Sequence, residues 1–314
     1  MNTKNIDVMV ISPLPPVMLA ELENLFTIHN YWLADDKADF LKKTGKFIRG
    51  VVTRSHLGIN ANIINALPSL EIISIFGVGL DAVDLETAQH RHIHVTNTPK
   101  VLSECVADTG LALMLNVSRR ICEADRFARS SAWQNGPFPS STRMHGKICG
   151  IAGLGNVGHA VAKRAQGFVM PIHYYDPFTQ DASYKRFDTL IALAESCDFL
   201  VLTLPGGADT FHVIGKDVLT ALGKNGILVN IARGSIVDTL DLINALKNND
   251  ILGAGLDVFE EEPAIPHELF EFNNVVLLPH IASNTNETRS DMANLAVENI
   301  KNYFEKGEMI TPVI

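Results

Sequence analysis

The 314-residue sequence predicts an α/β fold with two doubly wound parallel-sheet domains. Its length is too great for one small core and suits two domains. Short apolar runs alternate with helical patterns in two separate series, and the irregular stretch "RSSAWQNGPFPSSTRMHG" lies between them. Because βα alternation produces a parallel sheet with helices on both faces, each series predicts one such sheet.

The first series begins at the N-terminus. Its apolar runs predict strands, and the patterns between them predict helices at 17–26 and 60–67. A last strand, "HVTNTP", ends at Pro99, which cannot continue it. The strands that we expect before it are "DVMVIS" (7–12), "GVVTR" (50–54) and "EIISIFG" (71–77).

The second series follows a long helix, expected at about 101–120, and an irregular stretch that reaches about residue 145. A final amphipathic helix, at about 286–305, is expected to return to the first domain. The predicted domains are therefore 1–98 plus 284–314, and 99–283. The second domain has six expected strands, at 147–153, 171–176, 198–205, 226–232, 253–259 and 274–280.

Composition excludes several classes of protein. The formal net charge of −9 disfavours binding to nucleic acid or to an anionic membrane, since both need a basic face. No apolar stretch reaches the length of a membrane span, and the start "MNTKNIDVMVIS" does not resemble a signal peptide. The four cysteines are scattered without a CxxC pair, so we expect no metal site and a reducing cytoplasm.

A glycine fingerprint opens the second series. Gly153, Gly155 and Gly158 form a G-x-G-x-x-G between a strand and a helix, the context that gives this motif its meaning. The first glycine makes the tight turn, the second admits a pyrophosphate, and the third allows close packing of helix and strand. The helix N-terminus then stabilises the anion. The alternative, glycines for packing alone, explains less of this context.

Asp176 ends the next strand, 18 residues after Gly158. A carboxylate at that place accepts hydrogen bonds from adenosine ribose hydroxyls and repels a 2′-phosphate. The next residues are Pro177 and Phe178, and no arginine follows directly. The sequence therefore predicts NAD (NADH) as cofactor in a Rossmann domain. The alternative is a carboxylate that only caps its own loop.

Three further strand ends carry charged or titratable residues. They are Arg233, the acidic run "EEEP" after Asp257, and His280. Because ligands of such sheets bind outside the carboxyl ends of the strands, these side chains are expected to converge. Arginine offers forked donors to a 2-keto acid, and histidine gives the carbonyl oxygen a proton as hydride arrives. A glutamate beside the histidine stabilises the imidazolium and orients its ring.

Each of these residues has a plainer interpretation. His280 could be an ordinary loop histidine, Arg233 could form a structural ion pair, and the acidic run could be a solvated turn. Their occurrence at three consecutive strand ends favours the catalytic interpretation. His212 lies in a loop with no glutamate near it in the sequence, so it is not expected to act.

The combination "GLGNVG", "NIARGSIVD", "GAGLDVFEEEP" and "LLPHIAS" resembles the D-isomer-specific 2-hydroxyacid dehydrogenases, and the resemblance runs nearly end to end. It implies a flavodoxin-like substrate (catalytic) domain, a Rossmann domain and an active-site cleft between them. It also implies that Arg233 binds substrate, that His280 is the acid/base, and that Glu262 is its partner, with Glu260 and Glu261 left solvated.

The resemblance further implies where substrate and cofactor are held. "FGVGLDAVD" resembles the family's substrate loop, so the backbone amides of Val78 and Gly79 are expected to hold a carboxylate. A tight turn after the strand is the alternative explanation for the glycines of this loop. The cofactor contacts that it implies beyond the fingerprint glycines and Asp176 come from Asn156, Val157, Val106, Leu204, Ile231, Ala232 and Asp257.

Within the family, "VADTGLALMLNVSRRICEADRFARSSAW" and the ending "ITPVI" are most similar to the glyoxylate/hydroxypyruvate and hydroxyphenylpyruvate reductase branch. Members of that branch often use NADP, so Asp176-Pro177 is a departure. The region 119–145, with Trp133 and Phe138, resembles the family's dimerising arm and predicts a homodimer. The alternatives are an NAD-sensing, non-catalytic protein of the same fold, or a dehydrogenase for another small acid such as phosphoglycerate, formate or phosphite.

Overall fold

The computed structural model describes residues 3–314, which form two compact units. Unit 1 contains the chain up to Leu102 together with Thr285–Ile314, and unit 2 is Ser103–Asn284. The sequence predicted these domain boundaries between residues 98 and 99 and between residues 283 and 284. Among the described residues, no helix has the length and apolar character needed to cross a membrane.

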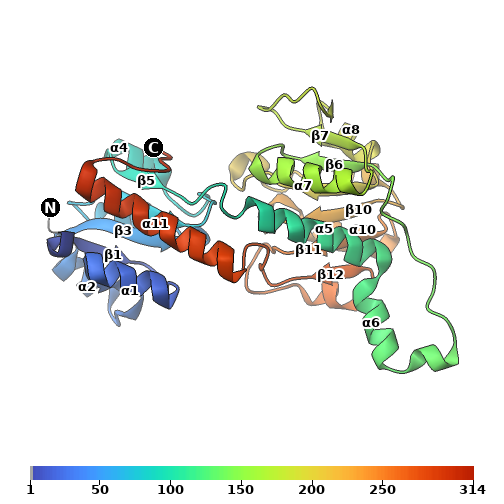
Figure 1. The fold of residues 1–314 in the computed structure, drawn as a ribbon, viewed down its shortest axis with the longest axis horizontal. Coiled ribbons are helices and arrows are strands. Elements are labelled where there is room, and N and C mark those ends of the chain that lie inside the picture. The colour runs from blue at the N-terminus through green and yellow to red at the C-terminus, as the bar shows by residue number, and fades with distance from the viewer. Residues whose placement is uncertain (1–2) are drawn as a thin grey trace. The chain divides into compact units, whose positions relative to one another are not determined.

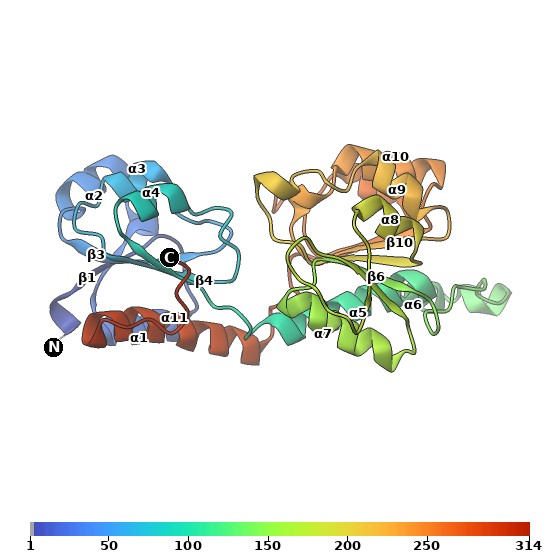
Figure 2. The same cartoon turned by 90° about the horizontal axis from the view of Figure 1, so that it is seen from above.

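Unit 1 is built on a five-stranded parallel sheet in the order β2-β1-β3-β4-β5. Helices α1 and α11 cover one face, and α2, α3 and α4 cover the other (Figures 1 and 2). The strands are β1 (Asp7–Val10), β2 (Thr27–Asn30), β3 (Ile48–Arg54), β4 (Ile72–Phe76) and β5 (His94–Thr96). The helices are α1 (Pro16–Leu25), α2 (Lys37–Thr44), α3 (Ala61–Asn65), α4 (Leu85–His90) and α11 (Asn286–Lys306).

Burial explains which helices and strands of unit 1 could be predicted from the sequence. All five residues of β4 are buried, as expected of a parallel strand covered on both faces. The edge strand β2 has no buried residue and reads "TIHN", so it lacks an apolar run and was not predicted. Helix α2, also not predicted, buries none of its residues and starts at Asp36, whose carboxylate accepts from two backbone amides.

Unit 2 has a seven-stranded parallel sheet in the order β12-β11-β10-β9-β6-β7-β8. Helices α5 and α7 cover one face, and α8, α9 and α10 the other (Figure 2). The strands are β6 (Cys149–Ala152), β7 (Ile172–Tyr175), β8 (Lys185–Arg186), β9 (Phe199–Leu202), β10 (Ile227–Asn230), β11 (Gly253–Leu256) and β12 (Val275–Leu277). The helices are α5 (Ser103–Arg119), α6 (Ile121–Arg129), α7 (Asn156–Gly167), α8 (Leu190–Glu195), α9 (Lys216–Leu222) and α10 (Thr239–Asn248).

The order of this sheet positions the site. Strands β10, β11 and β12 are neighbours, and β9 and β6 continue the row. Because all are parallel, their carboxyl ends share one edge, and the loops that follow them meet there. Helix α5 lies close enough to β11 that a side-chain carbon on Gly255 would stand 2.9 Å from Leu113. Strand β11, one of the strands that end at this edge, is therefore packed tightly against helix α5.

Candidate active site

The glycine turn after β6 has the geometry of a phosphate cradle. Gly153 has a φ of +95°, a region open mainly to glycine. An added carbon on Gly158 would stand 2.2 Å from the Gly153 carbonyl, whereas one on Gly155 would meet nothing within 4 Å. The third glycine thus serves packing, and the second leaves open space at the start of α7. No side chain caps this helix, so its first amides are available to an anion.

Asp176 follows β7 and is buried. Its Oδ2 accepts from the Leu154 amide at 2.7 Å, and its Oδ1 accepts from Phe178 and Thr179 at 2.8 and 2.7 Å. Burial opposes ionisation, but these backbone donors hold the pKa of the carboxyl below its usual value. A carboxylate offers about four acceptor positions, so Oδ2 has room for one ribose hydroxyl. Asp176 therefore caps its loop and is also placed to bind ribose.

The open space, the uncapped helix and the ionised carboxylate fit a nicotinamide dinucleotide. Four apolar residues predicted to face its nicotinamide half are buried in unit 2: Val106, Leu204, Ile231 and Ala232. The backbone of Leu204 lies next to Gly153, because an added carbon there would stand 3.0 Å from the Leu204 nitrogen. The turn after β6 and the turn after β9 are thus adjacent.

Arg233 follows β10, and a buried asparagine shapes the turn that carries it. The Asn230 side chain accepts from the Ala232 amide at 3.0 Å and donates to the Arg233 carbonyl at 2.8 Å. Gly234 comes next and packs against the turn after β11, because an added carbon would stand 1.9 Å from the Phe259 carbonyl carbon. The arginine segment and the acidic turn are therefore in direct backbone contact.

Glu262 and His280 form a short hydrogen-bonded pair. His280 Nδ1 lies 2.6 Å from Glu262 Oε2, and the other carboxylate oxygen accepts from the Phe259 amide at 3.0 Å. Burial disfavours the charged carboxylate, yet the hydrogen bond from His280 and the charges of His280 and Arg233 hold the Glu262 pKa below its usual value. With Nδ1 facing Glu262, Nε2 is the ring nitrogen left for a substrate.

Asp257 fixes the backbone around His280. This fully buried carboxylate accepts from the Ile281 and Ala282 amides at 2.8 and 2.9 Å, and its own carbonyl accepts from the His280 amide at 2.8 Å. His280 has a φ of +53°, a costly conformation for a residue with a side chain. Burial raises the pKa of Asp257, although the two amides favour its charged form. The predicted cofactor contact thus also positions the histidine.

One expectation about the acidic turn is wrong. Glu260 was expected to be solvated, and His212 was set aside because no glutamate lies near it in the sequence. His212 Nε2 lies 2.5 Å from Glu260 Oε1, its Nδ1 lies 3.2 Å from Asp238, and Thr239 donates to Glu260 at 2.7 Å. These contacts join residues far apart in the chain, so no local pattern could have revealed them.

In unit 1, the loop after β4 has the open amides expected of an anion cradle. The Val78 carbonyl accepts from the Asn97 side chain at 2.9 Å. Within residues 3–314, neither the Val78 amide nor the Gly79 amide donates to a protein acceptor. Gly77 precedes them with a φ of +137°, and an added carbon there would stand 2.3 Å from Ser55 Oγ.

Comparison with known proteins identifies the family. Residues 111–282 match the NAD binding domain of the D-isomer specific 2-hydroxyacid dehydrogenases. The chain is 44% identical over 312 residues to glyoxylate/hydroxypyruvate reductase A HPR2 of Arabidopsis thaliana, covering 99% of this chain and 100% of the relative. The chain belongs to this family.

Two more relatives agree with this assignment. The chain is 44% identical to the hydroxyphenylpyruvate reductase of Plectranthus scutellarioides over 98% of its own length and 99% of the relative. A Sinorhizobium meliloti NADPH-dependent glyoxylate/hydroxypyruvate reductase, solved with NADP and malonate, superposes with a TM-score of 0.91 at 39% identity, covering 98% and 97% of the chains. The predicted fold class and family are confirmed, and the chain is a nicotinamide-dependent oxidoreductase of this family.

Proposed function

We propose that this 2-hydroxyacid dehydrogenase reduces a small 2-keto acid of the glyoxylate or hydroxypyruvate type to the D-2-hydroxy acid, and catalyses the reverse reaction. The observation that carries the proposal is the Glu262–His280 pair, 2.6 Å apart, on strand ends adjacent to the one that bears Arg233. The relatives named for glyoxylate and hydroxypyruvate reduction support this substrate class.

Each catalytic side chain has one task in the proposal. The bound nicotinamide supplies the hydride, or accepts it in the reverse direction. Arg233 offers forked donors to the substrate carboxylate and carbonyl oxygen, which orients the acid. His280 gives a proton from Nε2 to the carbonyl oxygen as the charge develops there. Glu262 stabilises the imidazolium and fixes the ring, and the Val78 and Gly79 amides hold the carboxylate.

A panel of 2-keto acids with NADH tests the activity. Glyoxylate, hydroxypyruvate, phenylpyruvate and phosphohydroxypyruvate, assayed by loss of nicotinamide absorbance, separate the branches of the family. Formate and phosphite, assayed with NAD, test the alternative that the protein is a dehydrogenase for one of these other small acids. Binding of NADH without turnover of any acid would instead favour an NAD-sensing protein of the same fold.

NADH is proposed as the preferred cofactor. The support is Asp176, whose ionised carboxylate lies beside the glycine turn and is followed by Pro177 rather than a basic residue. A 2′-phosphate would meet a negative charge there. Comparing kcat/KM for NADH and NADPH with one keto acid is decisive, and a clear preference for NADPH would reject the proposal.

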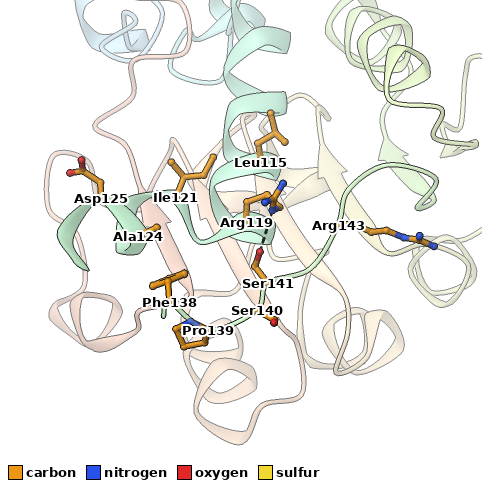
Figure 3. A pocket seen from close by; sticks show the side chains of 10 residues that line it. All are labelled: Leu115, Arg119, Ile121, Ala124, Asp125, Phe138, Pro139, Ser140, Ser141 and Arg143. Atoms are coloured by element: carbon orange, nitrogen blue, oxygen red, sulfur yellow. Dashed lines mark hydrogen bonds between the residues drawn. The ribbon is translucent and has the colours of Figure 1, made fainter. Parts of the chain in front are cut away.

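A homodimer is proposed through the arm formed by residues 119–145. Helix α6 forms the first part of this arm, which extends away from the body of unit 2 (Figure 1). At the base of the arm, ten residues line a hollow of about 850 Å³, among them Arg119, Ile121 and Phe138 (Figure 3). Trp133, further along the arm, is 72% exposed. Apolar surface of this kind is commonly covered by a partner.

Sedimentation tests the dimer with a matched pair of variants. Trp133→Ser should weaken self-association, whereas Leu240→Ser, at an equally exposed position outside the arm, should not. A wild-type protein that is monomeric at micromolar concentration would refute the proposal.

Closure of the two predicted domains around substrate stays a prediction, which small-angle scattering with and without ligands can test.

A further inference from the structure

Two arginines of unit 1 lie together at the carboxyl ends of the central strands. Arg54 is the last residue of β3 and is the register partner of Phe76, the last residue of β4. The Arg289 guanidinium, from α11, lies 4.5 Å from the centre of the Phe76 ring. Both side chains are partly buried. Two cations from different elements thus meet at one edge of the sheet.

These two guanidinium groups differ from the other partly buried arginines. Within residues 3–314, neither Arg54 nor Arg289 forms an ion pair or a side-chain hydrogen bond, although Arg289 contacts the Phe76 ring. The remaining partly buried arginines each donate to a carboxylate or a carbonyl: Arg49, Arg91, Arg120, Arg164 and Arg233.

The electrostatics show that the pair lacks a counter-charge. Burial lowers the pKa of Arg54, and burial together with the charge of Arg54 lowers the pKa of Arg289. The other partly buried arginines whose pKa departs from the usual value have it raised by a carboxylate partner, as Glu71 does for Arg49. Two like charges held together in this way lower their free energy when an anion binds between them.

The neighbouring loop suggests which anion comes here. Ser55 follows Arg54 directly, and its hydroxyl lies against Gly77, the residue before the open amides of Val78 and Gly79. Neighbouring strands are about 4.8 Å apart, which is comparable with the length of a short keto acid. A substrate whose carboxylate is held by the loop after β4 can therefore extend its other end toward the arginine at the end of β3.

We propose that Arg54 and Arg289 form a second anion site in unit 1, which selects 2-keto acids that carry another negative charge, a carboxylate or a phosphate, at the end remote from the reacting carboxylate. The inference rests on the proposed function, because it assigns the tail of that substrate. A neutral hydroxylated tail, as in hydroxypyruvate, is still accepted but leaves the two like charges uncompensated, so the site raises kcat/KM for a charged tail above that for a neutral one.

Matched substrates test the site. Oxaloacetate and 2-oxobutyrate have the same chain length, but only the first has a tail carboxylate, and phosphohydroxypyruvate with hydroxypyruvate makes the same comparison for phosphate. The wild type should prefer the charged member of at least one pair by tenfold or more in kcat/KM. Arg54→Gln should reduce that preference by about tenfold to a hundredfold, the range for a charge-assisted hydrogen bond. Arg54→Lys should restore part of it.

Two further variants complete the design. Arg289→Gln should reduce the same preference, and it serves if Arg54→Gln does not fold. Arg49→Gln is the matched control, because it removes a cation from the other end of β3 that is already paired with Glu71. An unchanged preference in both the Arg54 and Arg289 variants, or a wild type that prefers the neutral member of both pairs, would overturn the proposal.

A measurement without turnover separates this site from the proposed reaction. With NADH present, the dianion tartronate should raise the Tm more than the monoanion D-lactate, and Arg54→Gln should abolish the difference. If no keto acid is reduced but this difference is seen and is lost in the variant, the reaction is wrong and the site stands. If keto acids are reduced and neither readout depends on Arg54 or Arg289, the site is wrong and the reaction stands.

Discussion

The two units carry charge at their strand ends in opposite ways. In unit 2, His280 faces Glu262 at 2.6 Å, and the buried carboxylate of Asp257 accepts from two backbone amides. In unit 1, Arg54 and Arg289 meet with no carboxylate from residues 3–314 beside them. In each unit these groups lie at the carboxyl ends of its own parallel sheet. Among the described residues, only unit 2 supplies protein groups that compensate the charges there.

The difference separates groups that do chemistry from groups that recognise a ligand. A proton donor must keep its orientation through every cycle, so its partners belong to the protein. A recognition site gains most when the ligand itself supplies the missing charge, because the attraction is then realised only on binding. The comparison therefore predicts that variants in unit 2 change rates and pH dependence, whereas variants of the arginine pair change substrate preference.

The largest effect in unit 2 is expected for His280→Ala. Loss of the proton donor should lower kcat by about 10²–10⁴-fold, while NADH affinity is largely kept. His267→Ala is the control, because that exposed histidine packs edge-to-face against Phe270 in the same unit and has no part in the Glu262–His280 pair. Steady-state kinetics and NADH titration check the result, and near-normal kcat would remove His280 from the mechanism.

Arg233→Ala should chiefly impair binding and orientation of the keto acid. The loss of forked, charge-assisted hydrogen bonds should lower kcat/KM by about tenfold to a hundredfold. Arg233→Lys should recover only part of this, because an ammonium group lacks the planar fork. If the lysine variant matched the wild type, charge alone would explain the role of Arg233, and the bidentate geometry would be rejected.

Glu262→Gln should move the pH dependence of reduction downward. The amide cannot stabilise the imidazolium, so the rate should begin to fall at a lower pH than in the wild type. Glu261→Gln, one residue away and without an ion pair among the described residues, is the control. Identical pH–rate profiles for the wild type and Glu262→Gln would contradict the assigned partnership.

The lowered pKa of Glu262 also sets a stability test. A carboxylate whose folded pKa lies below its unfolded pKa stabilises the protein above the unfolded value. That contribution is lost as the pH falls through the folded pKa. The Tm difference between the wild type and Glu262→Gln should therefore be largest near neutrality and should shrink in acid. A difference that grew toward low pH would have the wrong sign.

Asp176→Asn should destabilise unit 2 as well as weaken NADH binding. Three backbone amides point at the carboxylate, and the NH₂ group of asparagine cannot accept from them. We expect a loss of about 2 kcal/mol in the free energy of unfolding, within the range for hydrogen bonds to a charged group. Asp188→Asn, at an exposed position, is the control. Unchanged stability would leave Asp176 with a purely cofactor-binding role.

The smallest effect is expected on the stability of unit 1. Arg54→Gln removes one of two like charges, so without ligand the Tm should stay unchanged or rise slightly. Thermal unfolding checks this directly. A clear loss of stability would show that Arg54 has a structural role in the ligand-free protein, and the contrast between the units would then be weaker.

Local sequence determined the sheets and most of the proposed catalytic groups. Buried parallel strands such as β4 and β10 are continuous apolar runs, and turns at their ends need glycine or carry charge, so their positions can be predicted from neighbouring residues. Gly153, Asp176, Arg233 and His280 were singled out for this reason, whereas Glu262 was chosen among three adjacent glutamates because the sequence resembles the family. Strand β2 was missed because an edge strand with no buried residue has no such run.

Tertiary structure alone decided the contacts that join distant segments. His212 is paired with Glu260 across 48 residues, Asp257 holds the amides after His280, and Arg289 reaches Phe76 from a helix more than two hundred residues away in the sequence. Whether a charged side chain is paired or unpaired depends on which strand ends become neighbours. That order follows from packing of whole helices and sheets, and short patterns of residues do not encode it.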